Sequence, residues 1–231
     1  MMDVALVPSQ VAKYNLTKKI AVVIDVLRFS TSVSAAFQAG AEAFYPVEDP
    51  SQAFALKKED PNLLLAGERR ALKIPGFDFG NSPLEHLQED HRGKRIVFCT
   101  TNGTRAVHLG AKAKKVVLAS IRTARAVAQF LKAEGQEVLF IPAGTGGRFS
   151  LEDIWCAGQI LSHLPGPSFG DGARAAQAIF EAISLSELEN SEHARNLVRL
   201  GFQNDLSYCL KKDADSNVVL WDSKSGWGRL A

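Results

Sequence analysis

Three stretches of the sequence place acidic, hydroxyl and amide side chains directly after apolar runs. The first is AGTGGRFSLED at residues 143–153, where a glycine-rich segment precedes Glu152 and Asp153. Glycine lets backbone N–H groups crowd around phosphate oxygens, whereas carboxylates repel phosphate. A divalent cation resolves this conflict, because Mg²⁺ is held by carboxylates and substrate phosphate oxygens together. The stretch therefore predicts a site in which a metal ion bridges protein acids and an anionic ligand.

One of these two acids also has a structural explanation. Ser150 followed by Asp153 is typical of a helix N-cap with an acid in the first turn. Neither Glu152 nor the glycines are explained in this way. We therefore interpret Glu152 as a catalytic and metal-binding candidate and Asp153 as a metal-binding candidate. Gly144 and Arg148 are candidates for binding the substrate.

The second stretch is VVIDVLRFSTS, in which an apolar run delivers Asp25 and then Arg28. A helix cap at Ser30 or Thr31, with Asp25 compensating the helix dipole, is the structural alternative. A functional interpretation is favoured, because the end of a buried strand needs neither Asp25 nor Arg28 for a structural role. Asp25 is thus a candidate for metal binding and catalysis and Arg28 for catalysis. Ser30 is a candidate for substrate binding.

The third stretch, FCTTNGTRA, crowds hydroxyls, an amide and a glycine into one expected strand-to-helix turn. An Asn-Gly pair alone indicates an ordinary turn, but the threonines beside it supply more hydrogen-bonding groups than a turn requires. We expect substrate to be bound by four residues of this turn: Thr101, Asn102, Gly103 and Thr104.

The same stretch contains the C-x5-R spacing of cysteine phosphatases, formed by Cys99 and Arg105. In those enzymes a thiolate attacks phosphorus. Phe98 stands where a histidine usually precedes the cysteine, and a cysteine that ends a buried strand is the simpler interpretation. A cysteine-dependent phosphatase remains one alternative, and a non-catalytic protein that binds anionic metabolites is another.

A further acid, Glu68, ends the predicted strand LLLAGERR. It would complete a metal cluster with the acids of the first two stretches. The alternative is a solvated glutamate beside Arg69 and Arg70.

Short apolar runs alternate with stretches of helical spacing along the chain, which predicts a βα alternation. Because the runs are apolar on both faces, we expect a three-layer α/β/α fold with a largely parallel sheet. We expect one domain over residues 1–231, mostly helical from about residue 171, with a long ordered loop at residues 72–83. The predicted strands cover residues 20–26, 43–47, 95–100, 115–119, 137–143 and, near the end, 217–221; the predicted helices cover 30–40, 51–58, 104–111, 123–135 and 150–164.

Composition excludes several classes of protein. The 231 residues are 46% hydrophobic and 23% charged with a net charge of +2, so there is no basic stripe for nucleic acid. Three widely spaced cysteines support neither a disulfide framework nor a zinc ribbon, and they favour the cytoplasm. No apolar run approaches membrane-spanning length. The expected partner is a small anionic molecule, and a homo-oligomer is compatible with these features.

Taken in order, five segments resemble the 2-phosphosulfolactate phosphatase family of coenzyme M biosynthesis. They are VIDVLRFSTS, GERRALKIPGFDFGNSP, TTNGTRA, AGTGGRFSLED and, less specifically, NDLSYCLKKD. The resemblance covers most of the chain. It implies a cytoplasmic, Mg²⁺-dependent α/β hydrolase that removes phosphate from 2-phospho-3-sulfolactate.

The resemblance also implies a set of functional residues. It supports Asp25, Arg28, Ser30, Glu68, the turn 101–104, Gly144, Glu152 and Asp153, and it adds Asn81 and Ser82, with Asp205 and Asp213 less securely. Asn81 joins the substrate-binding candidates on this ground alone.

The resulting hypothesis is a Mg²⁺-dependent phosphatase for a small acidic phosphate ester. Arg28, Arg148 and the threonine turn would hold phosphate and sulfonate or carboxylate oxygens. Either a metal-activated water or a carboxylate such as Asp25 attacks phosphorus. Leu27 stands where the D-x-D motif of aspartyl-phosphate enzymes needs its second aspartate, and no Walker A motif is present.

Overall fold

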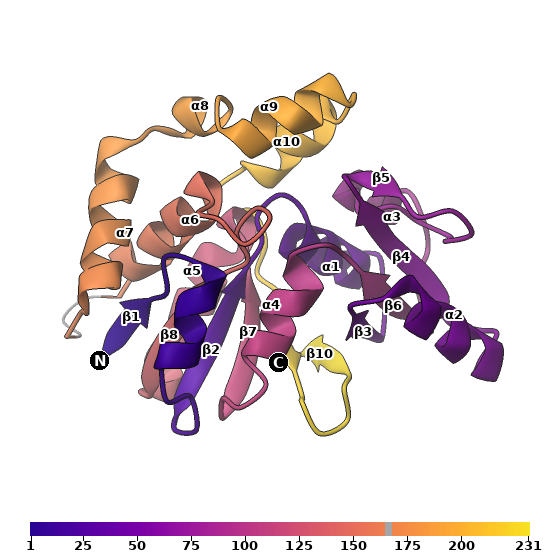
Figure 1. Ribbon diagram of the computed structural model, residues 1–231, viewed down its shortest axis with the longest axis horizontal. Coiled ribbons are helices and arrows are strands. Elements are labelled where there is room, and N and C mark those ends of the chain that lie inside the picture. Colours follow the sequence, from indigo (N-terminus) through magenta and orange to yellow (C-terminus); the bar gives the residue numbers. More distant parts are fainter. Residues whose placement is uncertain (165–167) are drawn as a thin grey trace.

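The computed structural model describes residues 1–164 and 168–231, and Figure 1 shows its arrangement. The strands are β1 (Met2–Val4), β2 (Lys19–Ile24), β3 (Ala43–Val47), β4 (Leu64–Arg69), β5 (Leu72–Lys73), β6 (Arg95–Cys99), β7 (Lys115–Ala119), β8 (Glu137–Pro142), β9 (Val219–Trp221) and β10 (Gly228–Leu230). The helices are η1 (Pro8–Lys13), α1 (Phe29–Gln38), α2 (Pro50–Glu59), α3 (Pro83–Leu87), α4 (Gly103–Leu109), η2 (Ile121–Thr123), α5 (Ala124–Glu134), α6 (Leu151–Ser162), α7 (Asp171–Ala182), α8 (Leu185–Leu188), α9 (Glu192–Arg199) and α10 (Gln203–Cys209).

Within the described ranges the ten strands form one sheet in the order β1-β8-β2-β7-β9-β10-β3-β6-β4-β5. Two parallel blocks, β1-β8-β2-β7 and β3-β6-β4, lie on either side of the β9–β10 hairpin. The hairpin pairs antiparallel with β7 and β3, and β5 pairs antiparallel with β4. The sheet is therefore largely parallel, as predicted.

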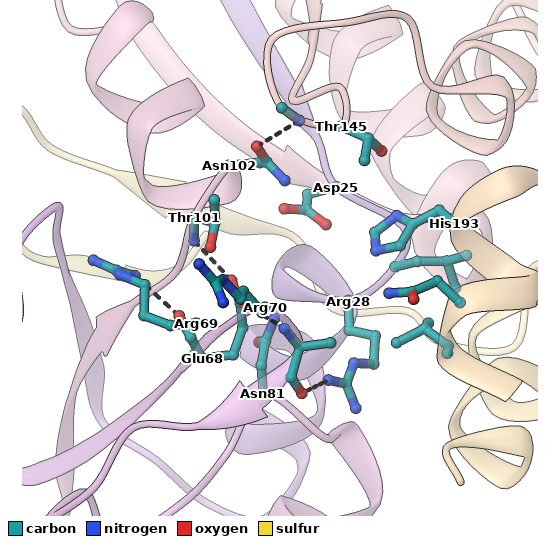
Figure 2. Close-up of a pocket in the computed structure, with 15 residues that line it drawn as sticks. Asp25, Arg28, Glu68, Arg69, Arg70, Asn81, Thr101, Asn102, Thr145 and His193 are labelled. Carbon is teal, nitrogen blue, oxygen red and sulfur yellow. Dashed lines mark hydrogen bonds between the residues drawn. The ribbon is translucent and has the colours of Figure 1, made fainter. Parts of the chain in front are cut away.

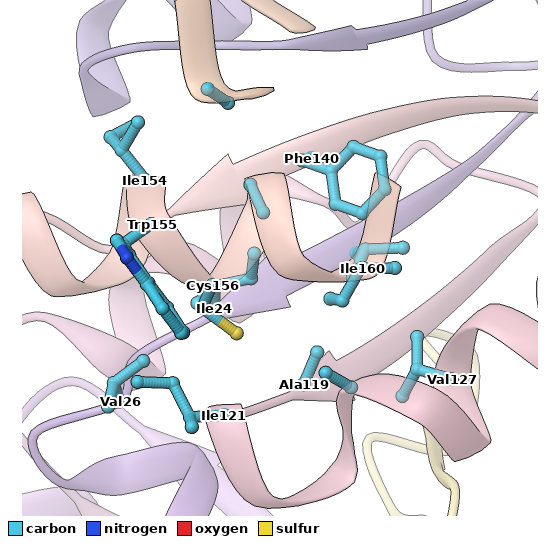
Figure 3. Close-up of a cluster of buried hydrophobic side chains, with 14 of the residues drawn as sticks. Ile24, Val26, Ala119, Ile121, Val127, Phe140, Ile154, Trp155, Cys156 and Ile160 are labelled. Atoms are coloured by element: carbon cyan, nitrogen blue, oxygen red, sulfur yellow. The ribbon is translucent and has the colours of Figure 1, made fainter. Parts of the chain in front are cut away.

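Strand β2 shows why the fold has three layers. Successive side chains of a strand point to opposite faces of a sheet. Ile20, Val22 and Ile24 pack in one core with residues of α5, α6 and α7, and Figure 3 shows part of this core around Ile24. Ala21 and Val23 pack in a second core with residues of α1 and α4. Both faces of the strand are buried between helices, which explains its uninterrupted apolar run. Figure 1 shows these two groups of helices on opposite sides of β2 and β7.

Short elements account for most differences from the sequence prediction. The loop expected at residues 72–83 contains β5 and reaches the start of α3. Both residues of β5 are exposed, so no alternating burial pattern could mark the strand. The 3₁₀ helix η1 and strands β1 and β10 were also not predicted. Elements of two to six residues carry too little of a period to be recognised from sequence.

From Asp171 the chain forms four helices before returning to the sheet through β9 and β10. The sheet order makes these last strands central rather than peripheral. Figure 1 places α8, α9 and α10 together, beyond one end of the strands of the first parallel block. In the part of the chain that the structure describes, no helix has both the length and the apolar character needed to cross a bilayer.

Candidate active site

A cavity of about 410 Å³ lies where four strand ends meet helix α9. A volume of this size suits a small metabolite. Figure 2 shows Asp25 between Asn102 on one side and His193 on the other. Residues that line the cavity include Asp25 and Arg28 after β2, Glu68, Arg69, Arg70 and Ala71 from the β4–β5 hairpin, Asn81 before α3, Thr101 and Asn102 after β6, Thr145 and Gly146 after β8, and His193 and Asn196 on α9.

The Asp25 carboxylate has one fixed and one available oxygen. Its Oδ1 accepts a hydrogen bond from the Phe29 N–H at 3.2 Å, and its own N–H donates to Ser30 Oγ at 3.2 Å. Within residues 1–164 and 168–231, Oδ2 has no hydrogen-bond partner. The predicted substrate residue Ser30 is itself buried in the first turn of α1, where it fixes the Asp25 backbone. Asp25 therefore presents one free carboxylate oxygen to the cavity.

The surroundings of Asp25 disfavour its negative charge. The pKa of Asp25 is raised to about 6, chiefly by burial and to a smaller extent by the nearby carboxylates Glu68 and Glu152, while His193 and the Phe29 N–H act in the opposite direction. Desolvation and like charges both destabilise the ionised carboxylate. A cation beside Asp25 would relieve this destabilisation.

Glu68 links the β4–β5 hairpin to the turn after β6. Its Oε1 accepts a hydrogen bond from the Thr101 N–H at 2.7 Å, and its Oε2 accepts one from the Ala71 N–H at 2.8 Å. The residue is 8% exposed, so it is not the solvated surface glutamate of the alternative interpretation. The backbone N–H groups hold the carboxylate in place at the wall of the cavity.

Glu152 lies behind the cavity and contacts it through His193. The Nδ1 atom of His193 lies 3.1 Å from Glu152 Oε1, and Glu152 is 1% exposed. Burial alone would raise the pKa of Glu152, but the hydrogen bond and charge of His193 outweigh it and lower the pKa. Burial alone would lower the pKa of His193, and the hydrogen bond and charge of Glu152 raise it. The pair therefore favours an ionised Glu152 beside Asp25.

Asp153 ties the ends of β2 and β8 together. Its Oδ1 accepts a hydrogen bond from the Val26 N–H at 2.9 Å, and its Oδ2 accepts one from the Gly144 N–H at 3.1 Å. Burial, together with the charges of nearby acids, raises the pKa of Asp153 well above its usual value. The predicted N-cap is confirmed, because Ser150 Oγ accepts the Asp153 N–H. Neither Asp153 nor Gly144 is among the residues that line the cavity.

Gly103 allows α4 to approach the Asp25 carboxylate. A Cβ atom at this position would lie 2.5 Å from Asp25 Oδ2 and would also collide with the Phe29 ring. Real Cβ atoms do not come so close to their neighbours, so a side chain at residue 103 would displace the carboxylate. Gly103 thus acts through close packing of backbone against Asp25 rather than through its own contact with a ligand.

The glycine-rich loop after β8 closes onto the threonine turn. Thr145 and Arg148 exchange two backbone hydrogen bonds of 3.1 Å, and Gly146 and Gly147 between them have φ angles of 60° and 77°. This left-handed pair suits glycine. The Gly146 N–H donates a hydrogen bond to Asn102 Oδ1 at 3.2 Å. Figure 2 draws this bond as a dashed line between Asn102 and the loop that carries Thr145. The two predicted anion-binding segments therefore meet in one wall of the cavity.

Arg28 connects the cavity to the C-terminal helices. Its Nη1 donates to Asp205 Oδ2 at 2.6 Å, its Nη2 donates to the Ala71 carbonyl at 2.9 Å, and its guanidinium lies 4.0 Å from the Phe202 ring centroid. Asp205 Oδ1 also accepts the Ser82 hydroxyl at 2.7 Å. Arg28 and Asp205 are both nearly inaccessible to solvent. These residues form one buried link between α10 and the β4–β5 hairpin.

Thr104, Arg148 and Asp213 also lie outside the residues that line the cavity. Thr104 is buried and hydrogen-bonds to Thr100 through both its N–H and its hydroxyl. Arg148 is 67% exposed and pairs with Glu192 at 3.0 Å. Asp213 accepts the Arg125 N–H and so holds the start of α5. These contacts are structural, and a role of these residues in binding substrate stays a prediction.

The residues around the cavity fit a Mg²⁺ ion held by few protein ligands. In the described ranges, no three His, Cys, Asp or Glu side chains are grouped closely enough to hold a metal by themselves. Mg²⁺ commonly uses only one or two carboxylates and completes its shell with water and substrate phosphate. Asp25 and Glu68 both line the cavity, and the buried Asn81 Oδ1 has no hydrogen-bond partner among the described residues. Such an orphaned carbonyl oxygen calls for a donor or a cation.

Cys99 and Arg105 do not form a shared site. Cys99 is buried at the end of β6, packs in a third core with residues such as Leu65, and contacts Arg69 Nη2 at 3.3 Å. Burial raises the pKa of the Cys99 thiol, although Arg69 opposes this effect. Arg105 lines a separate cavity of about 170 Å³ beside η1. A thiolate mechanism needs both residues around one phosphoryl group, and this arrangement does not provide it.

Sequence reasoning did not assign His193, Asn196 or Arg70 to the site, although all three line the cavity. His193 lies on α9, far along the chain from Asp25, and no motif surrounds it. Arg70 was considered only as a charged neighbour of Glu68. The signal available in the sequence was the position of Arg70 just before the long loop predicted at residues 72–83.

The family model described as 2-phosphosulpholactate phosphatase matches residues 5–224 of this chain. The chain belongs to this family. Similar proteins include one from Clostridium perfringens (strain SM101), 41% identical over 91% of this chain and 89% of the relative. Another is from Thermotoga petrophila, 40% identical over 94% of each chain, and a third from Symbiobacterium thermophilum is 42% identical over 84% of this chain and 88% of the relative. All three are named "Probable 2-phosphosulfolactate phosphatase".

Membership of the 2-phosphosulfolactate phosphatase family makes the chain a phosphoric monoester hydrolase. The resemblance read from the five sequence segments is confirmed. An enzyme is therefore favoured over a non-catalytic binding protein. The cavity around Asp25 is the candidate active site of this member of the family.

Proposed function

We propose that this protein hydrolyses 2-phospho-3-sulfolactate to 3-sulfolactate and inorganic phosphate, with Mg²⁺ as its cofactor. The free Oδ2 of Asp25 carries the proposal, because it lies in a cavity that combines clustered carboxylates with arginine side chains. Carboxylates alone would repel a phosphate ester. Carboxylates with a divalent cation, next to guanidinium groups, suit a small and strongly acidic one.

Asp25, Glu68 and Asn81 would hold the metal, since all three line the cavity and each carries a side-chain oxygen. Held there, Mg²⁺ would supply Lewis-acid polarisation of a phosphoryl oxygen. In the net reaction an oxygen nucleophile bonds to phosphorus and the ester P–O bond breaks. The released alkoxide takes up a proton, and one water is consumed. Asp25 orients the nucleophile, or itself attacks, through its free oxygen.

The remaining walls position the ester and shield it from water. Thr101 and Asn102 offer hydroxyl and amide donors to phosphoryl oxygens, and the Glu68 contact fixes the Thr101 backbone. His193 and Glu152 neutralise one another behind Asp25. We also propose that the enzyme works in the cytoplasm on a free metabolite, which accords with three cysteines that are all free and buried.

Release of phosphate from 2-phospho-3-sulfolactate tests this proposal directly. We expect turnover in Mg²⁺, loss of at least about a hundredfold in excess EDTA, and recovery when Mg²⁺ or Mn²⁺ is restored. A panel of phosphorylated hydroxy acids measured in parallel ranks the substrates. Full activity in EDTA would exclude the metal role, and binding of the ester without release would favour the non-catalytic alternative.

Replacing Cys99 by Ser tests the thiolate mechanism. The change exchanges a buried sulfur for a hydroxyl, so we expect a loss of stability of about 1 kcal/mol. Turnover by the folded variant is expected to stay within about threefold of wild type, because the thiol does not line the active-site cavity. Phosphate release and urea unfolding measure the two quantities.

Cys156→Ser is the matched control, since Cys156 is equally buried but lies on α6. Both variants should lose stability and retain turnover. A thousandfold loss of turnover in Cys99→Ser alone would contradict the metal mechanism and restore the cysteine alternative.

A further inference from the structure

The turn of the β4–β5 hairpin consists of Arg70 and Ala71, with φ angles of 55° and 66°. The pairing of Arg69 with Leu72 makes these two residues the complete connection. A two-residue turn with positive φ at both positions is normally occupied by Asn-Gly or Gly-Gly. Side chains with a Cβ atom are disfavoured there by about 1–2 kcal/mol per residue. An arginine in this position is therefore not explained by the turn itself.

Arg70 differs from the other two arginines of the cavity in having no protein partner. Arg28 is paired with Asp205 and hydrogen-bonded to the Ala71 carbonyl. Arg69 donates to the backbone carbonyls of Glu68 and Glu48. Within residues 1–164 and 168–231, Arg70 makes neither a hydrogen bond nor an ion pair, although it lines the cavity. Its guanidinium is thus available to a ligand.

Hydrogen bonds hold both backbone groups of Ala71, the residue that follows Arg70 in the turn. The Ala71 N–H donates to Glu68 Oε2 at 2.8 Å, and the Ala71 carbonyl accepts from Arg28 Nη2 at 2.9 Å. Figure 2 shows Glu68, Arg70 and Asn81 on the same side of the cavity, below Asp25. Arg70 therefore extends from a backbone that hydrogen bonds already hold in place. This reduces the conformational entropy that the turn loses when a ligand binds.

We propose that Arg70 is the specificity-determining residue that binds the second acidic group of the substrate. This inference rests on the proposed function and deepens it. The phosphoryl group would lie at the carboxylate and metal end, near Asp25, and the sulfonate or carboxylate would lie against Arg70. A planar guanidinium donates two parallel hydrogen bonds to such an oxyanion. Phosphate esters without a second acid would lack this contact.

The two halves of the substrate provide a binding test that needs no turnover. Inorganic phosphate and 3-sulfolactate are titrated separately by calorimetry in the presence of Mg²⁺. In Arg70→Gly we expect the Kd of 3-sulfolactate to rise about 10- to 100-fold, while the Kd of inorganic phosphate changes less than about threefold. Glycine suits the left-handed turn, so this variant should fold at least as well as wild type.

Two further variants sharpen the result. Arg70→Lys keeps the positive charge but loses the two parallel N–H donors of the guanidinium group. The Kd of this variant for 3-sulfolactate is therefore expected to lie between those of wild type and Arg70→Gly. Arg105→Ala removes an arginine from the separate cavity beside η1, and both Kd values should stay unchanged. With 2-phospho-3-sulfolactate, Arg70→Gly should raise KM about 10- to 100-fold and leave kcat within about threefold.

Equal weakening of inorganic phosphate and 3-sulfolactate in Arg70→Gly would overturn the inference and assign Arg70 to the phosphoryl group. Unchanged binding of both ligands would overturn it as well. Failure of the wild-type enzyme to hydrolyse any acidic ester would instead refute the proposed function, and it is recognised by phosphate release rather than by calorimetry. The two failures are therefore distinguishable.

Discussion

Asp25→Asn is expected to lower phosphate release about a thousandfold while the fold is retained. The substitution keeps the shape of the side chain and an oxygen that accepts the Phe29 N–H. It removes the negative charge next to the reacting atoms and from the proposed metal shell, and loss of such a group typically reduces kcat by about 10²–10⁴-fold. Phosphate release at saturating substrate and Mg²⁺ measures the effect.

The same variant should be more stable than wild type at pH 7 in EDTA. Because the pKa of Asp25 in the folded protein is raised to about 6, folding favours its protonated form. The stability that this protonation contributes is present below the unfolded value near 3.8 and is lost as the pH rises through about 6. Asparagine carries no charge at any pH, so the variant should gain about 2–3 kcal/mol at pH 7.

Asp49→Asn is the control for these measurements. Asp49 is an exposed N-cap of α2, and asparagine caps a helix as well as aspartate. This variant should match wild type in both turnover and unfolding. The assignment of Asp25 is wrong if Asp25→Asn retains wild-type turnover.

Asp205→Ala is expected to destabilise the folded protein by about 3–5 kcal/mol. The change leaves the buried Arg28 guanidinium without its counter-ion and Ser82 without its acceptor. An unpaired buried charge is far less stable than a buried pair, which accounts for the size of the loss. Since Arg28 also holds the Ala71 carbonyl, the KM of the remaining folded enzyme should increase. Urea unfolding monitored by circular dichroism and tryptophan fluorescence gives the stability.

Two comparisons identify the cause of this loss. The double variant Arg28→Met, Asp205→Leu removes both charges together, so it should recover a large part of the stability without recovering full activity. Glu192→Ala breaks the exposed pair with Arg148 and should change stability by at most about 1 kcal/mol. A loss below about 1 kcal/mol in Asp205→Ala would show that the buried pair contributes little.

The sequence was most informative where a long apolar run ended in a polar group. The β2 run is apolar on both faces, which predicted a buried strand, and the residue after it, Asp25, presents a free oxygen to the cavity. Thr101 and Asn102 were found in the same way after β6. Strand period and strand ends are local properties, so both were accessible without knowledge of the tertiary structure.

The sequence was least informative where a side chain had a choice of partners. Asp153 and Glu152 are adjacent acids in one helix turn, yet one accepts backbone N–H groups and the other accepts His193. His193 comes from α9, whose amphipathic pattern predicts a buried face but not what that face contacts. Arg70 reaches the cavity only because a two-residue turn projects it there. These arrangements depend on tertiary packing.

The central place of the β9–β10 hairpin has a consequence for folding during synthesis. The ribosome delivers these strands after all the others, yet they lie between β7 and β3. Until they arrive, the edges of β7 and β3 that they will cover have no neighbours in the sheet, and open strand edges are templates for pairing with another chain. The growing protein therefore exposes its aggregation-prone edges at the middle of the future sheet. Insertion of the hairpin is the step that ends this exposure and joins the two halves of the molecule.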